Sequence, residues 1–215
     1  MKYFDTVNPM KKLLVALALT LTAPVAALAD TFTAGKDYQV IASPVPVEKP
    51  GMIEVREFFW YGCPHCFRLD PYIQNWLKTK PKDVNFVRTP ASLNPVWEAN
   101  ARGFYALEQI GGNDLIEKTH ATLFNTIHEK QVRIFDENSL ANFSQQFGVD
   151  PAKFHGLFNS FVVTSKVNYS RSLAQKLQID GVPALIVNGK YRVSGEDDKA
   201  LEKVNFLIAK ERGGK

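Results

Sequence analysis

Cysteine is nearly absent from this sequence: its 215 residues include only two, Cys63 and Cys66. A framework of several disulfides is therefore excluded. A disulfide between these two cysteines would close a ring of about four residues, and the loop-entropy relation gives such a ring about 2 kcal/mol, against about 4.7 kcal/mol for a loop of ~100 residues. A pair so poorly spaced for stabilising a fold indicates thiol chemistry.

The sequence also lacks a basic cluster, internal repeats and low-complexity tracts. Its net charge is +4, and its 26 Lys and Arg are mixed along the chain with 22 Asp and Glu. Mixed charge without a basic patch gives no support to nucleic-acid binding. A chain of this length without repeats fits one domain, or one domain with an insertion.

No apolar run reaches the ~20 residues that a membrane span needs. The apolar stretch 13–28 is interrupted by two threonines and a proline, follows Met10-Lys11-Lys12 and ends at Ala27-Leu28-Ala29. This arrangement is typical of a secretory signal peptide, with a membrane anchor as the weaker alternative. Cleavage after Ala29 would remove three lysines and one aspartate and leave 186 residues with 23 basic and 21 acidic side chains, a net charge of +2.

Export sets the redox environment of the two cysteines. Disulfides form and persist outside the cytoplasm, and the bacterial periplasm is kept oxidising. We therefore predict a periplasmic protein whose cysteine pair works under oxidising conditions.

The hydrophobic pattern predicts an α/β domain. Residues 53–60 are continuously β-branched and aromatic, which is typical of a strand buried on both faces. Gly62 and Pro64 then mark a turn into a helix that ends near Pro81, and a strand over 84–88 completes a strand, helix, strand unit suited to parallel pairing. Residues 38–41 are a candidate edge strand.

The middle of the chain differs from its ends. Amphipathic patterns predict only helices between 94 and 159, broken at Gly111-Gly112-Asn113, and a further helix over about 161–178. Asn188-Gly189 between two apolar runs indicates a hairpin, followed by a last helix to about residue 210. We predict four segments: a signal peptide (1–29), the first part of the α/β domain (30–93), a helical insertion (94–160) and the second part of the domain (161–215).

The two cysteines fall at the predicted junction between a strand and a helix. Unpaired backbone N–H groups and the helix dipole stabilise an anion there, and His65 is a second source of positive charge, so we expect Cys63 to be a thiolate. A Cys63 pKa of about 5 would stabilise the reduced form at pH 7 by about 2.7 kcal/mol, or about 60 mV toward a more oxidising couple. Cys66, one turn on and nearer the core, is the expected resolving thiol.

Glu57 is a carboxylate inside a strand predicted to be buried, which is costly without a partner. It is a candidate for carrying protons to or from Cys66. The alternative is that Glu57 points to an edge or pairs with a basic residue such as Arg56 or Lys78.

Two cysteines at this spacing are also common in zinc-binding sites. A structural zinc site needs two more ligands, and His120, His128 and His155 lack the paired spacing of metal ligands. We predict no metal, and treat these three as surface or internally hydrogen-bonded histidines.

Taken together, these features resemble the DsbA family of periplasmic thiol-disulfide oxidoreductases, a branch of the thioredoxin fold. The resemblance rests on Glu57-Phe58-Phe59 before Cys63-Pro64-His65-Cys66, on Gly181-Val182-Pro183-Ala184 about 115 residues later, and on the signal peptide in front. It implies a thioredoxin-like α/β fold with an inserted helical domain.

The resemblance assigns a role to several residues. Cys63 would be the exposed nucleophile, His65 would hold its thiolate, Cys66 would be the buried partner and Glu57 the buried acid. The loop at Val182 and Pro183, with a cis peptide bond, would bind an extended substrate segment beside the disulfide, together with Pro64 and Phe59. The implied redox group is the Cys63–Cys66 disulfide itself, without any cofactor.

In function, the resemblance implies an enzyme that donates its disulfide. A thiolate of an unfolded exported protein would attack Cys63, and a second substrate thiolate would resolve the mixed disulfide. A DsbB-type membrane quinone reductase would then reoxidise the pair. Two alternatives remain: a periplasmic reductase or isomerase, which Pro64-His65 disfavours, and a peptide-binding chaperone with a secondary dithiol, which the helical insertion with its aromatic residues would suit.

Overall fold

The computed structural model describes residues 1–3 and 32–213, and the folded unit begins at Phe32. The predicted signal peptide, 1–29, lies outside the described residues except for its first three. Among the described helices, none combines the length and the apolar character needed to cross a membrane.

A five-stranded sheet forms the centre of the folded unit. Its spatial order is β1-β5-β4-β2-β3, with β2 and β3 parallel and the other neighbouring pairs antiparallel. The strands are β1 (Gln39–Val40), β2 (Ile53–Phe59), β3 (Val84–Pro90), β4 (Ala184–Val187) and β5 (Tyr191–Val193). The predicted central strand is confirmed, since every residue of β2 is buried, and the candidate edge strand is β1.

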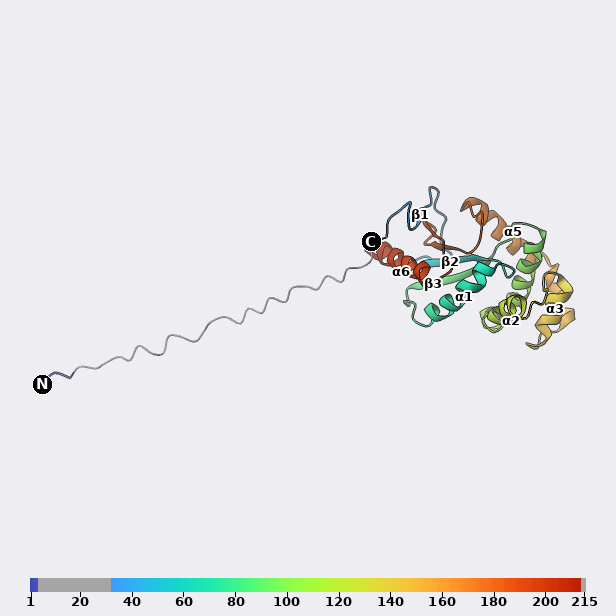
Figure 1. The fold of residues 1–215 in the computed structure, drawn as a ribbon, viewed down its shortest axis with the longest axis horizontal. Helices are drawn as coiled ribbons and strands as arrows, with labels where there is room; N and C mark the ends of the chain where they lie inside the picture. Colours follow the sequence, from blue (N-terminus) through green and yellow to red (C-terminus); the bar gives the residue numbers. More distant parts are fainter. Residues whose placement is uncertain (4–31, 214–215) are drawn as a thin grey trace. The chain divides into compact units, whose positions relative to one another are not determined.

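The six helices described are α1 (Pro64–Leu77), α2 (Pro95–His128), α3 (Glu137–Gln145), α4 (Pro151–Phe158), α5 (Phe161–Lys176) and α6 (Asp198–Gly213). Helix α2 is broken at Gly112, whose backbone is not helical (φ 62°, ψ −158°), as the Gly-Gly-Asn sequence predicted. Helices α2 and α3 lie together at the end of the folded unit remote from β1 (Figure 1).

Different helices cover the two faces of the sheet. Side chains alternate along β2, so consecutive residues of this strand meet different helices. Ile53 and Val55 pack with residues of α1 and α6, whereas Phe58 packs with the second half of α5. Glu57 lies on the same face of β2 as Val55, directed toward α1. This alternation decides which helix each side chain of β2 meets.

The predicted hairpin is confirmed, and it positions the loop before β4. Asn188 (φ 52°) and Gly189 (φ 66°) both have positive φ, as the two central residues of a type I′ turn require, and the Lys190 N–H donates to the Val187 carbonyl at 3.0 Å. Strand β4 runs antiparallel to β2 with Ala184 opposite Phe58. The loop at Val182 and Pro183 therefore lies at the carboxyl end of β2, where the cysteines follow.

The aromatic residues of the helical segment are mostly core, as expected. A cluster of buried side chains from α2, α3 and α4 also includes Val163 and Val167 in the first half of α5. The second half of α5, with Leu173 and Ala174, packs on the sheet instead. Helix α5 thus joins the two parts, and the predicted boundary between residues 160 and 161 stays a prediction.

Candidate active site

Helix α1 begins at the first cysteine. Cys63 is the N-cap residue and Pro64 occupies the first helical position, where its missing N–H costs nothing. The Cys63 side chain is less accessible than expected: the residue is 7 % exposed, while Pro64 and His65 are exposed. Little of the Cys63 surface is therefore accessible, next to two exposed residues of α1.

The environment of Cys63 favours its thiolate. Hydrogen bonding from the Cys66 thiol is the largest cause, burial opposes it, and the backbone N–H groups of Cys66 and His65 and the charge of His65 contribute further. Together they lower the pKa of Cys63 from 9.0 to about 6. The helix N-terminus thus acts as predicted, but the second thiol matters more and the charge of His65 matters least.

Cys66 has the opposite environment. It is completely buried, and burial, followed by interaction with Cys63, raises the pKa of its thiol far above the ordinary range. Both cysteines are free thiols in this structure. Around neutral pH, Cys63 therefore ionises while Cys66 keeps its proton.

Glu57 lies on the face of β2 toward α1 and is completely buried. Its partner is Arg88, which is opposite it in the parallel register of β2 and β3, with 3.9 Å between Arg88 Nε and Glu57 Oε2. Burial outweighs the attraction of Arg88 and raises the pKa of Glu57 to about 8. The carboxyl group thus carries a proton at pH 7, and its charge state acts on Cys66.

One alternative paired Glu57 with Arg56, and this pairing is wrong. The Arg56 side chain lies on the other face of β2, where Nε is 2.9 Å from Glu54 Oε1 and Nη2 is 2.7 Å from Glu48 Oε1. Adjacent residues of a strand point to opposite faces, which rules out the pairing. The alternative that Glu57 points to an edge of the sheet is also wrong, because β2 lies between β3 and β4.

His65 points toward the surface and binds a carboxylate. Its side chain is 57 % exposed, and Nδ1 lies 2.5 Å from Oε2 of Glu196, in the loop between β5 and α6. Arg68 contacts the same oxygen through Nη2 at 2.7 Å. The His65 ring is thus engaged with Glu196 and Arg68 at the surface, and among the causes that act on the pKa of Cys63 it comes last.

The loop before β4 lies directly against the first cysteine. The Cys63 thiol donates to the carbonyl oxygen of Val182 at 3.3 Å, and the Val182–Pro183 peptide bond is cis, as the resemblance implied. Val182 and Pro183 are half-buried and Pro64 is exposed. These three residues thus lie next to Cys63 with part of their surface accessible.

Phe59 is wrongly placed among the substrate-binding residues. It is 0 % exposed, and its ring packs against Tyr61 at 5.1 Å and against Phe104 at 5.7 Å between ring centroids. As the last residue of a strand buried on both faces, it belongs to the core beneath the cysteines.

Of the two expectations for His120, a surface or an internally hydrogen-bonded histidine, the structure shows the second. His120 of α2 lies with Nδ1 2.9 Å from the Tyr61 hydroxyl and Nε2 3.3 Å from Oδ1 of Asp70, on α1. The sequence pattern indicates that His120 is buried, because it falls four residues after Ile116 and four before Phe124, on the apolar face of its helix. A histidine on such a face needs polar partners, which come from elements distant in sequence.

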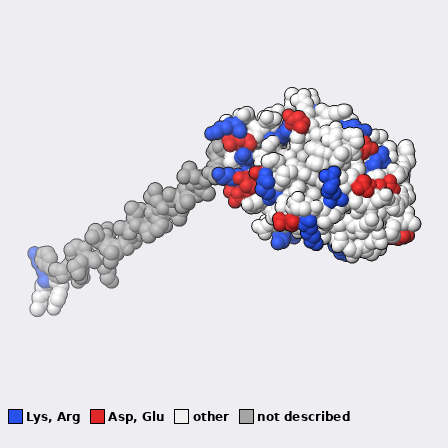
Figure 2. Space-filling view, turned by 45° about the vertical axis from the view of Figure 1, so that its right-hand side comes forward, with Lys and Arg blue, Asp and Glu red and all other residues white. Residues whose placement is uncertain are grey.

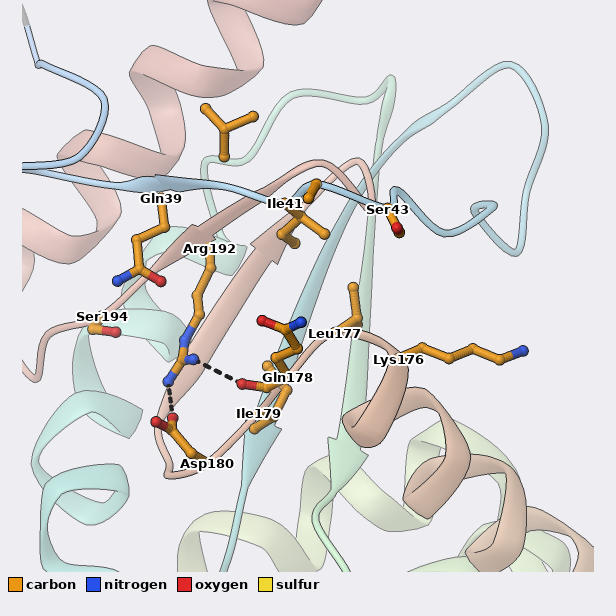
Figure 3. A pocket seen from close by; sticks show the side chains of 12 residues that line it. Gln39, Ile41, Ser43, Lys176, Leu177, Gln178, Ile179, Asp180, Arg192 and Ser194 are labelled. Carbon is orange, nitrogen blue, oxygen red and sulfur yellow. Dashed lines mark hydrogen bonds and ion pairs between the residues drawn. The ribbon is translucent and has the colours of Figure 1, made fainter.

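Other surfaces of the described chain are less distinctive. No group of three or more His, Cys, Asp or Glu among residues 1–3 and 32–213 is arranged to hold a metal ion. On the face shown in Figure 2, acidic and basic side chains are interspersed among uncharged ones. A hollow of about 670 Å³ lies between β1 and the end of α5, where Arg192 binds Asp180 and the carbonyl of Gln178 (Figure 3), and neither cysteine lines it.

Comparison with known proteins agrees with this geometry. The family model of the DSBA-like thioredoxin domain matches residues 54–203. The thiol:disulfide interchange protein DsbA of Pseudomonas aeruginosa is 40% identical over 200 residues, which are 91% of this chain and 93% of that protein. Its crystal structure has a TM-score of 0.79 at 39% identity, covering 85% of this chain and 96% of that one. The structure of the oxidoreductase DsbA from Xylella fastidiosa has a TM-score of 0.78 at 34% identity, covering 83% and 97%.

Proposed function

Because this chain belongs to the family of DSBA-like thioredoxin domains, and is a thiol:disulfide oxidoreductase with Cys63 and Cys66 as its active-site pair, we propose that it donates their disulfide to exported proteins as they fold. The observation that carries this direction is the difference between the two thiols. A pKa of about 6 for Cys63, against 9.0 ordinarily, stabilises the reduced form. At pH 7 this amounts to about 1.4 kcal/mol, or about 30 mV.

This effect is half of what a pKa of about 5 would give, but it has the same sign. A more stable reduced form makes the disulfide a stronger oxidant, because giving the disulfide away is then favourable. The result supports donation over the reductase or isomerase alternative.

The reaction proceeds in two exchange steps. A substrate thiolate attacks Cys63 Sγ, forming a mixed disulfide and releasing Cys66, which takes up a proton; Glu57, protonated at pH 7, is the proposed donor. A second substrate thiolate then attacks the substrate sulfur, forming the substrate disulfide and releasing Cys63 as its thiolate. The substrate loses two electrons and the Cys63–Cys66 pair gains them.

Substrate binding is proposed for the surface around Cys63. Among the described residues, the backbone of Val182 has no backbone hydrogen bond, so it can pair with an extended peptide. Pro183 and exposed Pro64 would flank the peptide. His65 would hold the thiolate after its release, through its backbone N–H more than through its charge.

For location and partners, we propose the periplasm and a membrane-bound quinone reductase of the DsbB type. The support is the signal-peptide pattern over 1–29 and the membership of the family. Substrates would be exported proteins with free cysteines, which are unfolded when they reach that compartment.

Two measurements test the proposed function. The first is the reduction potential of the Cys63–Cys66 pair together with the thiolate absorbance titration of Cys63. We expect a potential well above that of thioredoxin, which is about −270 mV, and a Cys63 pKa near 6. A potential at or below that of thioredoxin would instead indicate a reductase.

The second measurement is oxidative refolding of a reduced, unfolded substrate by the oxidised protein, with Cys63→Ser as the matched variant. We expect substrate disulfides to form with the wild type and not with the variant. Prevention of aggregation by the variant at the wild-type level, without oxidation by either, would support the chaperone alternative.

A further inference from the structure

Residues 178–183 join α5 to β4 and carry the proposed substrate contact at Val182. The segment begins at Gln178, whose positive φ of 53° is uncommon for a residue other than glycine. The Ile179 N–H donates to a carbonyl of α5 at 2.8 Å, and backbone pairing resumes in β4. In the described chain, residues 180–182 make no hydrogen bond between backbone groups, so their position depends on other contacts.

Arg192 supplies such contacts from β5, the neighbour of β4 in the sheet. Its Nη1 donates to the Gln178 carbonyl oxygen at 3.1 Å, and its Nη2 donates to Oδ1 of Asp180 at 2.6 Å (Figure 3). Asp180 is charged, because this second hydrogen bond holds the pKa of its carboxyl group below the usual value. One rigid, planar guanidinium thus binds the segment at two points.

Packing holds the beginning of the segment on one side only. Ile179 is buried against Phe58 of β2 and the second half of α5. Toward β1 lies the hollow of about 670 Å³, which residues 39–43 line from one side and residues 176–180 from the other (Figure 3). Arg192 also lines this hollow. Its two hydrogen bonds therefore hold the segment on the side where packing is missing.

The end of the segment lies against the reacting cysteine. The Val182 carbonyl oxygen is 3.3 Å from Cys63 Sγ, and the Val182 side chain packs against the core beneath the cysteines. Only Gly181 separates Val182 from Asp180 in the chain. A movement of Asp180 away from β5 would therefore displace the backbone with which a substrate peptide is proposed to pair.

We propose that Arg192 is a positioning residue for substrate binding: its guanidinium holds the Gln178 carbonyl and the Asp180 carboxylate, and thereby fixes the Val182 backbone beside Cys63 for an incoming peptide. This deepens the proposed function and rests on the proposed pairing of the substrate with Val182. The bonds that form and break are those of the exchange steps already given.

The test compares two thiols that react with the oxidised protein. One is a short peptide of uncharged residues with a single cysteine, which can pair with Val182. The other is dithiothreitol, which has no peptide backbone. In R192Q we expect the second-order rate constant with the peptide to fall about tenfold, because both contacts of the segment are lost. The rate constant with dithiothreitol should stay within about twofold of wild type.

R212Q is the matched control. Arg212 of α6 binds Asp83 with the same kind of geometry, with Nη2 2.6 Å from Oδ1 and Nε 2.8 Å from Oδ2. This pair joins α6 to the residues just before β3, far along the chain from the segment that Arg192 binds. We expect R212Q to change neither rate constant by more than about twofold.

D180A is a second, milder variant. The Asp180 side chain is 84 % exposed, so its removal leaves no cavity and the protein should fold. It removes one of the two contacts of Arg192, and we expect the rate constant with the peptide to fall about threefold. The peptide carries no charge, so the lost carboxylate has no direct electrostatic effect on it. If R192Q does not fold, D180A decides by the same criteria.

Amide hydrogen exchange reports on the position of the segment itself. In R192Q the amides of residues 180–182 should exchange faster than in wild type, and in R212Q they should exchange at the wild-type rate. Unchanged exchange in R192Q, an unchanged rate constant with the peptide, or an equal loss with dithiothreitol overturns the proposal.

These readouts separate the two proposals. A wild type that reduces a peptide disulfide instead of oxidising the peptide thiol overturns the proposed function. The same comparison is then made in that direction, between the peptide disulfide and oxidised dithiothreitol, and it still decides the role of Arg192. A normal oxidase whose reaction with the peptide is insensitive to R192Q overturns only the role of Arg192.

Discussion

Cys63 and Cys66 are one residue type three positions apart, and their different chemistry comes from their contacts. Cys63 lies at the N-cap of α1, where the neighbouring Cys66 thiol and the backbone N–H groups of the first helical turn lower the pKa of its thiol. Cys66 lies one turn further on with no exposed surface. Donors stabilise a thiolate and an apolar environment destabilises it, so the two thiols titrate far apart.

A first prediction concerns the contribution of Cys66 to the thiolate. In Cys66→Ala, we expect the pKa of Cys63 to rise from about 6 by about 1 pH unit, because its largest stabilising hydrogen bond is lost. Cys66→Ser keeps a donor and should show a smaller rise. Thiolate absorbance measured against pH checks both variants, and equal values in the two would contradict the assignment.

A second prediction concerns how the contribution of Glu57 to the free energy of unfolding changes with pH. Its pKa is raised in the folded state from 4.5 to about 8, so its favourable contribution is complete below pH 4.5 and is lost as the pH rises through 8. In E57Q, the free energy of unfolding relative to wild type should therefore increase by about 3 kcal/mol between pH 4.5 and 7. Urea unfolding at several pH values measures this difference, and a constant difference would show that Glu57 does not titrate in this range.

At the scale of elements, the hairpin between β4 and β5 controls the position of the loop at Val182. The turn residue Gly189 packs against the segment before β2, and a Cβ there would lie 2.0 Å from the carbonyl oxygen of Val45. The turn is therefore held by a close backbone approach as well as by its own conformation.

A third prediction compares two glycines with positive φ, 66° at Gly189 and 62° at Gly112. Gly189→Ala should destabilise the protein by about 2 kcal/mol or more, since it adds a clash with Val45 to the strain of positive φ. Gly112→Ala, at the break in α2, meets no atom within 4 Å, so it adds only the strain of this backbone conformation (φ 62°, ψ −158°) and should cost less, about 1 to 2 kcal/mol. Thermal unfolding of the two variants gives the comparison, and a larger loss in Gly112→Ala would contradict it.

At the scale of the whole molecule, the charge on Cys63 links redox state to folding. The thiolate exists only in the reduced protein, and its pKa is depressed in the folded state from 9.0 to about 6. The resulting stabilisation is complete above the unfolded pKa and is lost as the pH falls through about 6. Reduction should therefore stabilise the fold more at higher pH.

This gives a fourth prediction. Relative to the oxidised form, the free energy of unfolding of the reduced form should rise by about 1.4 kcal/mol from pH 5 to pH 7, and by about 2.7 kcal/mol from pH 5 to pH 8. Chemical unfolding of both forms at matched pH measures the difference. Cys63→Ser, compared in the same way, should show no such rise, and a rise that persists in it would assign the effect to another group.

The sequence determined the local features of this protein. Continuous β-branched and aromatic residues are stable only in a buried strand, Gly62 and Pro64 end that strand and start a helix, and Asn188-Gly189 closes a hairpin. These elements place Cys63 at a helix N-terminus, which is enough to predict a thiolate. Such inferences succeed because the interactions that decide them span only a few residues.

The tertiary structure decided which distant side chains meet. Glu57 pairs with Arg88 because of the parallel register of two strands, and His65 meets Glu196 although 131 residues separate them. Phe59 faces the core and not a substrate, and His120 contacts Asp70 across two helices. A sequence pattern indicates that a side chain is buried, but its partner and the cost of desolvating it depend on how the elements pack. The pKa values that separate the two thiols and protonate Glu57 therefore arise only in the folded molecule.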